Sequence, residues 1–246
     1  MRPILFRWQG FTVWSYPAML YAGLVAGIAA GNLAAHATGV DAFRVFAATL
    51  VLIPPSIIGA RLLYVFTHWR QYRGRPRRIW SRQEGGMAMY GALPVMLLLS
   101  APLVAVLGLG FGRFWDAASF TIMTGMVFTK TGCLLNGCCA GRCSPSRIAV
   151  SLPDSRGVWQ KRIPVQCLEA AWAAVLLATA AGFAGRLPFH GALFLLVAAL
   201  YSAGRLALEG LRERESDAGG GIFLARGFSM ITVVSALAIL IVQWPR

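Results

Sequence analysis

Seven long apolar stretches divide this chain and decide what it can fold into. Each is close to the ~20 residues that an α-helix needs to cross a bilayer. Only 13% of the residues are charged, whereas a soluble domain carries about a quarter. We therefore predict an all-α polytopic membrane protein of about seven transmembrane helices with a small loop-built head. It forms a single domain over 1–246, with spans at roughly 17–36, 42–66, 87–109, 116–136, 164–184, 189–207 and 227–244.

The positive charge gathers in three polar connections, at 67–86, 137–163 and 208–226. With seven spans, all three lie on the same side of the membrane as the N-terminus. The positive-inside rule predicts that this side faces the cytoplasm. Because the basic residues sit in short loops between spans, we expect membrane lipid as their partner and no nucleic acid. A net charge of +14 favours anionic lipid surfaces.

Charged residues also occur inside the apolar stretches, where each is costly and needs a reason. Arg61 and Tyr64 are three residues apart and share a helix face, and Tyr201, Arg205 and Glu209 follow one another at intervals of four. Two interpretations stay open. Arg205 and Glu209 form a structural ion pair, with the tyrosines in an interfacial belt, or the arginines converge on an anionic phosphate.

Four of the five cysteines lie in a segment of eleven residues, at Cys133, Cys138, Cys139 and Cys143, and the fifth is Cys167. A disulfide from Cys138 or Cys139 to Cys143 or Cys167 is one interpretation, and small thiols in tight helix contacts are another. We expect no metal, because adjacent cysteines point in different directions and would strain a tetrahedral site.

Several short motifs follow one another in order along the chain: Tyr16-Pro-Ala-Met-Leu-Tyr21, Gly59-Ala-Arg61-Leu-Leu-Tyr64, Glu84-Gly-Gly86-Met-Ala-Met-Tyr90-Gly91, Pro164-Val-Gln166-Cys167-Leu-Glu169 and Tyr201-x-x-x-Arg205-x-x-x-Glu209. In them and over nearly its whole length, the chain resembles the prolipoprotein diacylglyceryl transferase family. The family's signature loop is matched at Gly132, Asn136, Gly137 and Gly141. Lys130 replaces its arginine, Cys133 its first asparagine and Cys138 its glutamate, as in a divergent branch.

The resemblance implies transfer of the diacylglyceryl group from phosphatidylglycerol to the lipobox cysteine of a prolipoprotein signal peptide, with release of glycerol phosphate. It implies a multi-pass protein of the bacterial inner membrane, which we expect to be a monomer without a cofactor. The catalytic residues would be Tyr90, Lys130, Tyr201, Arg205 and Glu209. The substrate-binding residues would be Tyr16, Arg61, Gly86, Gly91, Gly132, Asn136, Gly137, Gly141 and Gln166.

The resemblance places the N-terminus and the head outside the cytoplasm, against the charge rule, and we expect the family orientation. Two alternative functions stay open because the signature loop differs. One is a transferase of the same fold with another donor or acceptor. The other is a non-enzymatic membrane protein that binds lipid or exchanges thiols.

Overall fold

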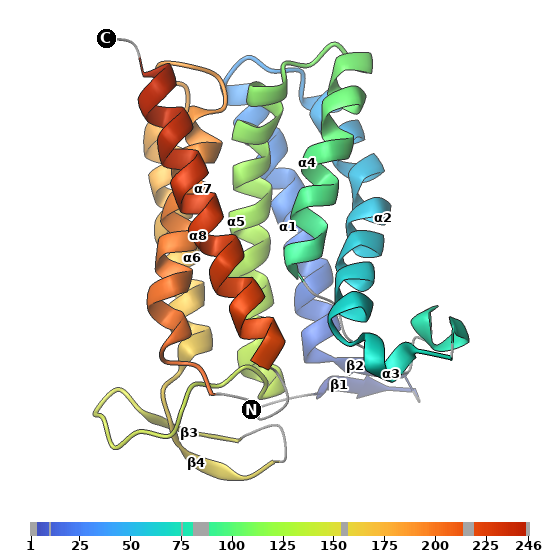
Figure 1. Cartoon of the computed structure of the whole chain (residues 1–246), viewed down its shortest axis with the longest axis vertical. Helices are drawn as coiled ribbons and strands as arrows, with labels where there is room; N and C mark the ends of the chain where they lie inside the picture. Colours follow the sequence, from blue (N-terminus) through green and yellow to red (C-terminus); the bar gives the residue numbers. More distant parts are fainter. Residues whose placement is uncertain are drawn as a thin grey trace.

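The computed structural model describes residues 4–9, 11–74, 76–80, 89–153, 157–213 and 219–244. For Phe11, Pro76, Met89, Tyr90 and 219–224 it describes the backbone alone. Within these residues, seven long helices run up and down as one bundle (Figure 1). They are α1 (Ser15–Ala37), α2 (Ala42–Thr67), α4 (Met89–Val106), α5 (Phe111–Asn136), α6 (Val165–Phe183), α7 (Ala192–Glu209) and α8 (Gly219–Gln243).

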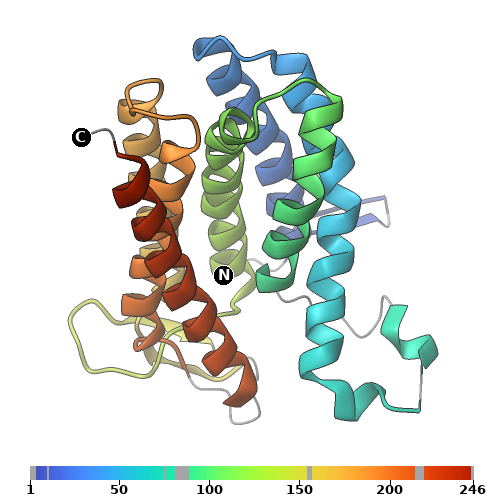
Figure 2. The same cartoon turned by 45° about the horizontal axis from the view of Figure 1, so that its top comes forward.

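The predicted fold class of about seven apolar helices is confirmed, and the helices lie close to the predicted ranges. Six of the described helices are long and apolar enough to cross a membrane, and α4 contributes a shorter apolar helix over Gly91–Val106. The turned view in Figure 2 shows α5 between two groups of helices. On one side lie α1, α2 and α4, and on the other α6, α7 and α8.

Short elements build a head at one end of the bundle (Figure 1). The strands β1 (Ile4–Trp8) and β2 (Phe11–Trp14) pair antiparallel before α1. The strands β3 (Val150–Pro153) and β4 (Trp159–Arg162) pair antiparallel between α5 and α6. The helix α3 (Trp69–Tyr72) and a 3-10 helix (Pro76–Trp80) follow α2. The predicted loop-built head is therefore present, and the basic connections lie at this end.

Glycines allow the helices to approach closely, as packing in lipid requires. A Cβ added at Gly27 of α1 would lie 2.7 Å from the backbone oxygen of Thr121 on α5. One added at Gly91 of α4 would lie 2.3 Å from the backbone oxygen of Gly59 on α2. Gly91, predicted to bind substrate, is therefore a point of contact between two helices.

The end of the bundle opposite the head holds an apolar core with its polar groups satisfied. Trp115 is 1% exposed and donates its indole N–H to Ser100 Oγ at 3.0 Å. Asp116 accepts hydrogen bonds from the backbone N–H groups of Gly191 and Phe194, at 2.7 and 2.9 Å, at the start of α7. A carboxylate there satisfies the unpaired N–H groups of the first helical turn. These two polar side chains therefore stabilise the packing at this end.

Candidate active site

A buried ion-pair cluster joins α5, α6 and α7 near the head. The carboxylate of Glu169 on α6 forms ion pairs with Lys130 Nζ of α5 at 2.8 Å and with Arg212 Nη1 at 3.2 Å. It also forms an ion pair with Arg205 of α7. Arg205 in turn pairs with Glu209, 2.9 Å away and one helical turn further on. Three cations and two carboxylates leave the cluster with one surplus positive charge.

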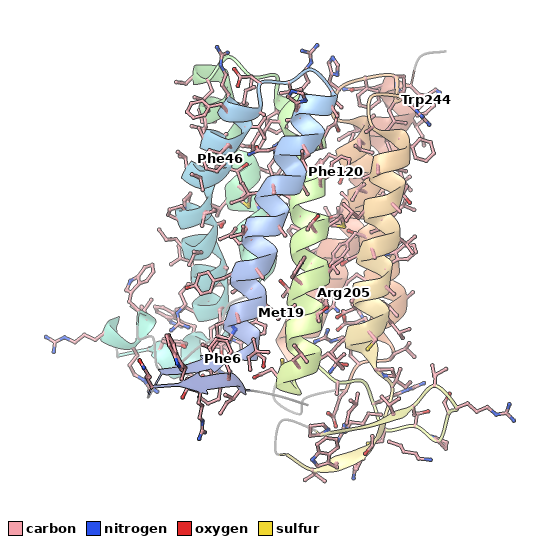
Figure 3. The ribbon with its side chains drawn as sticks, turned by 180° about the vertical axis from the view of Figure 1, so that it is seen from behind. Phe6, Met19, Phe46, Phe120, Arg205 and Trp244 are labelled. Atoms are coloured by element: carbon pink, nitrogen blue, oxygen red, sulfur yellow. The ribbon has the colours of Figure 1, made fainter. Side chains whose placement is uncertain are left out.

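These charged side chains are largely shielded from solvent, so the stability of the protein depends on how they are paired. The side chains of Glu169, Glu209, Arg205 and Lys130 are 6, 8, 12 and 13% exposed. Buried charges are stable only when paired and hydrogen-bonded. Figure 3 shows Arg205 inside the bundle toward its head end, at about the level of Met19 on α1. The ion pair of Arg205 and Glu209, one of the two interpretations left open by the sequence, is present and is part of a larger network.

Sequence reasoning missed Glu169 as a site residue. It ends the motif that begins at Pro164, in which only Gln166 is predicted to bind substrate. The available signal was its rarity, because the chain has only nine Asp and Glu residues and this one lies in an apolar span. An acidic residue at such a place needs a cationic partner.

An apolar cleft of about 120 Å³ lies between α4, α5, α7 and α8. Met126 of α5 and Tyr201 of α7 line it, with Leu93 of α4 and Phe228 of α8 on other sides. Met126 precedes Lys130 by four residues and Tyr201 precedes Arg205 by four, which is about one helical turn in each case. The cleft therefore lies about one turn from the cations on two helices.

The loop after α5 is fixed by a sharp helix end and by backbone pairing. Gly137 caps α5 in the left-handed region, with φ 77° and ψ 22°, and Cys138 N donates to Cys133 O at 3.1 Å. Gly141 N donates to Ile163 O at 3.0 Å, and a Cβ at Gly141 would lie 2.5 Å from that oxygen. The predicted glycines of the signature loop therefore shape its backbone.

Gln166 anchors the same loop from α6. It is fully buried and donates its Nε2 to Cys138 O at 2.7 Å. Its Oε1 is also buried and accepts no hydrogen bond from the residues that the structure describes. Gln166 therefore holds the loop through its Nε2 and places a buried acceptor, its Oε1, next to the loop.

Three cysteine side chains converge at this loop, which corrects the prediction made from adjacency. The sulfur atoms of Cys133, Cys138 and Cys139 all lie within 4.8 Å of one another. Cys139 has φ 61°, a left-handed conformation that is unusual for any residue but glycine. Adjacent cysteines diverge in extended backbone, whereas here the sharp turn brings both sulfurs to one side. The predicted reason for excluding a metal is therefore wrong.

All five cysteines are free, so the interpretation of a disulfide from Cys138 or Cys139 to Cys143 or Cys167 is wrong. Cys143 and Cys167 are exposed, and Cys143 Sγ donates to Gln160 Oε1 at 2.8 Å. Cys139 is exposed as well. Hydrogen bonds from the thiols of Cys133 and Cys138 hold the pKa of Cys139 below its usual range, and nearby cations add to this effect.

Arg61 lies apart from the ion pairs around Glu169. It is 6% exposed, and it donates to the backbone oxygens of Ile79 at 2.7 Å and Arg78 at 3.3 Å. Its guanidinium also lies 5.7 Å from the ring centre of Tyr64 and 5.6 Å from that of Tyr72. These contacts confirm that Arg61 and Tyr64 share a helix face, and they tie Arg61 to the segment after α3.

Other predicted residues surround the site or fall outside the description. A Cβ at Gly132 would lie 3.0 Å from Met19 Cβ and 3.6 Å from the Cα of Tyr16, so this glycine allows α5 to approach α1. Asn136 is exposed at the end of α5. Gly86 and the side chain of Tyr90 lie outside the described residues.

Comparisons of the sequence with a family model and with known proteins all point to the same family. The family model of prolipoprotein diacylglyceryl transferase matches residues 3–244. A phosphatidylglycerol–prolipoprotein diacylglyceryl transferase of Dehalococcoides mccartyi strain 195 is 31% identical over 188 residues, covering 72% of this chain and 68% of the relative.

Two further relatives carry the same name. The protein of Clostridium kluyveri is 26% identical over 243 residues, which covers 97% of this chain and 95% of the relative. The protein of Symbiobacterium thermophilum is 25% identical over 252 residues, covering 98% and 89%. With its multi-pass helical bundle and its family match from end to end, the chain belongs to the prolipoprotein diacylglyceryl transferase family.

Proposed function

We propose that this protein transfers the diacylglyceryl group of phosphatidylglycerol to the lipobox cysteine thiol of prolipoproteins and releases glycerol phosphate. It does so as a monomer in the bacterial inner membrane. The observation that carries the proposal is a buried cation cluster about one helical turn from an apolar cleft. Such a pair of sites matches a phospholipid, which has an anionic phosphate next to two apolar chains.

The charge of the cluster fits a phosphodiester. One surplus positive charge balances the single negative charge of that group, and the surroundings of low exposure strengthen the attraction. Lys130 and Arg205 face this phosphate, and Arg212 adds a third cation. Glu169 and Glu209 hold the two guanidinium groups in place. As the glycerol phosphate departs, negative charge develops on its oxygen, and fixed cations stabilise it without reorganising.

The cleft receives the part of the acyl chains next to the glyceryl group and thereby fixes the reacting carbon. Tyr201 lines it close to Arg205, so it contacts the glyceryl end of the lipid rather than the chain ends. Gln166 and the loop glycines Gly137 and Gly141 shape the wall on the head side. Arg61 holds the segment after α3 in position, so its effect on transfer is indirect.

The test uses purified protein with phosphatidylglycerol vesicles and a lipobox peptide, measuring released glycerol phosphate and the mass of the peptide. Arg205→Ala should lower the rate by about 10²–10³-fold, the effect expected when one preorganised charge contact is lost. Arg186→Ala is the matched control, because Arg186 is exposed in the connection between α6 and α7, opposite the head.

Wild-type activity in Arg205→Ala would remove the cluster from the mechanism. Glycerol phosphate without a modified peptide would favour the second candidate function, a transferase with another acceptor. The observation that favours this second candidate is that Lys130, Cys133 and Cys138 stand in place of signature residues of the family. Neither product from folded, lipid-binding protein would favour a non-enzymatic role.

A further inference from the structure

The three converging cysteines have no part in phosphate binding, and packing explains only one of them. Cys133 is buried, Cys138 is half-buried and Cys139 is exposed. A small apolar side chain would fill the place of Cys133, but an exposed thiol next to two others gains nothing from packing. The three sulfurs therefore form a set of soft ligands that solvent reaches at Cys139.

The geometry of the set suits a thiophilic divalent ion. Zinc binds thiolate sulfur at ~2.3 Å in a tetrahedron, which places the sulfurs about 3.8 Å apart. The three sulfurs are already within 4.8 Å of one another, so side-chain adjustments of about 1 Å complete the site. No fourth Cys, His, Asp or Glu joins the group among the residues that the structure describes. Zinc sites with three protein ligands and one open position are typical of catalysis, whereas structural sites are closed.

The backbone holds this ligand set in an unusual shape. The left-handed conformations of Gly137 and Cys139, at φ 77° and 61°, turn the chain so that the sulfurs meet. Gln166 fixes the carbonyl of Cys138, and Gly141 is pinned against Ile163. A non-glycine residue held at positive φ is a feature that clusters at functional sites.

We propose that Cys133, Cys138 and Cys139 bind one zinc ion, whose open position takes the acceptor cysteine of the prolipoprotein as a thiolate. This inference rests on the proposed function for its acceptor, although the metal site itself does not. Cys133 follows Lys130 by three residues on α5, so the two share a helix face. The bound acceptor thiolate is thereby brought to the cation cluster that holds the lipid phosphate.

The reaction then balances without a separate strong base. On binding zinc, the acceptor thiol releases its proton to solvent, since a coordinated thiol is deprotonated. A lone pair of its sulfur forms a bond to the glyceryl carbon that carries the phosphate. The bond between that carbon and the phosphate oxygen breaks, and its electron pair leaves with glycerol phosphate. No atom is oxidised or reduced, and the products are the thioether and glycerol phosphate.

The first experiment measures metal content independently of activity. Purified full-length protein is incubated with zinc chloride, freed of excess metal and analysed by mass spectrometry of the element, with cobalt loading as an optical probe of thiolate ligands. We expect one zinc ion per chain and intense sulfur-to-cobalt charge-transfer absorption. Cys138→Ser should lose both, whereas Cys143→Ser, which changes an exposed cysteine outside the set, should keep both. Folded wild-type protein that takes up no zinc, or that holds a disulfide between these cysteines instead, would overturn the proposal.

The second experiment tests the open position with a lipobox peptide and its Cys→Ser counterpart. The thiol peptide should change the cobalt spectrum, and the serine peptide should not. Equal spectra with both peptides would overturn the acceptor role. Failure of the proposed function is distinguishable, because it would leave zinc content unchanged and abolish transfer from phosphatidylglycerol. Wild-type protein stripped of zinc by a chelator should lose transfer and regain it on zinc addition, while full activity without metal would refute the inference.

Discussion

Replacing Glu169 by glutamine tests whether the ion-pair cluster holds α5, α6 and α7 together. The glutamine keeps the size of the side chain and removes its charge, so three cations would face only Glu209. The site is buried, with 6% of the Glu169 side chain exposed, so solvent cannot replace the lost charge.

Removing one partner of a buried ion pair costs about 3–5 kcal/mol. We expect the lower end, about 3 kcal/mol, because Glu209 still pairs with Arg205. In a chain of this size each kcal/mol lowers the Tm by about 2–4 °C, so the Tm should fall by about 6–12 °C. The measurement is thermal unfolding in detergent micelles, followed by tryptophan fluorescence.

Asp41→Asn is the matched control, with the same chemical change on an exposed ion pair. Asp41 and Arg44 are 48 and 51% exposed, and asparagine can still cap α2. Its cost should stay below about 1 kcal/mol. The double variant Lys130→Met with Glu169→Gln should recover part of the loss, because it removes one uncompensated cation. A Glu169→Gln protein that melts within about 2 °C of the wild type would refute the reasoning, since that shift corresponds to at most about 1 kcal/mol.

Three further predictions concern the loop, the core and the orientation. Gly141→Ala places a Cβ 2.5 Å from a backbone oxygen and should cost about 1–3 kcal/mol in chemical denaturation, whereas Gly182→Ala, with open space around it, should not destabilise. Ser100→Ala leaves the buried indole N–H of Trp115 without its acceptor and should lower the free energy of unfolding by about 1–3 kcal/mol, and an unchanged value would contradict that hydrogen bond. A membrane-impermeant maleimide should label the exposed Cys143 in intact spheroplasts, and labelling only after permeabilisation would place the head in the cytoplasm, as the charge rule predicts.

The spans and the pair of Arg205 and Glu209 were predictable because both depend on local order in the chain. A run of about 20 apolar residues determines a spanning helix, and a spacing of four places two side chains on one helix face. Each of these inferences uses neighbours within a single helix, and the structure contains both the apolar helices and the ion pair.

The centre of the site depends on contacts between distant segments, which the sequence does not display. Glu169 meets Lys130 and Arg205 only because three helices converge. The convergence of Cys138 and Cys139 depends on a left-handed turn at a residue that rarely adopts one. In regular backbone the side chains of Cys138 and Cys139 would diverge. The expectation that no metal could bind was based on that divergence, and it failed because Cys139 adopts a strained conformation.

The backbone pairing at the head has a mechanical consequence. Arg142 N donates to Leu211 O at 2.9 Å and Ile163 N donates to Arg142 O at 3.2 Å, so the loop after α5 is tied to the start of α6 and the end of α7. Because of these hydrogen bonds, α5, α6 and α7 cannot slide along one another unless main-chain hydrogen bonds break. Among the described residues, α4 and α8 have no backbone hydrogen bond to the loop after α5, to the start of α6 or to the end of α7. We therefore expect α4 and α8, which border the apolar cleft, to move more easily than the three helices that these hydrogen bonds join.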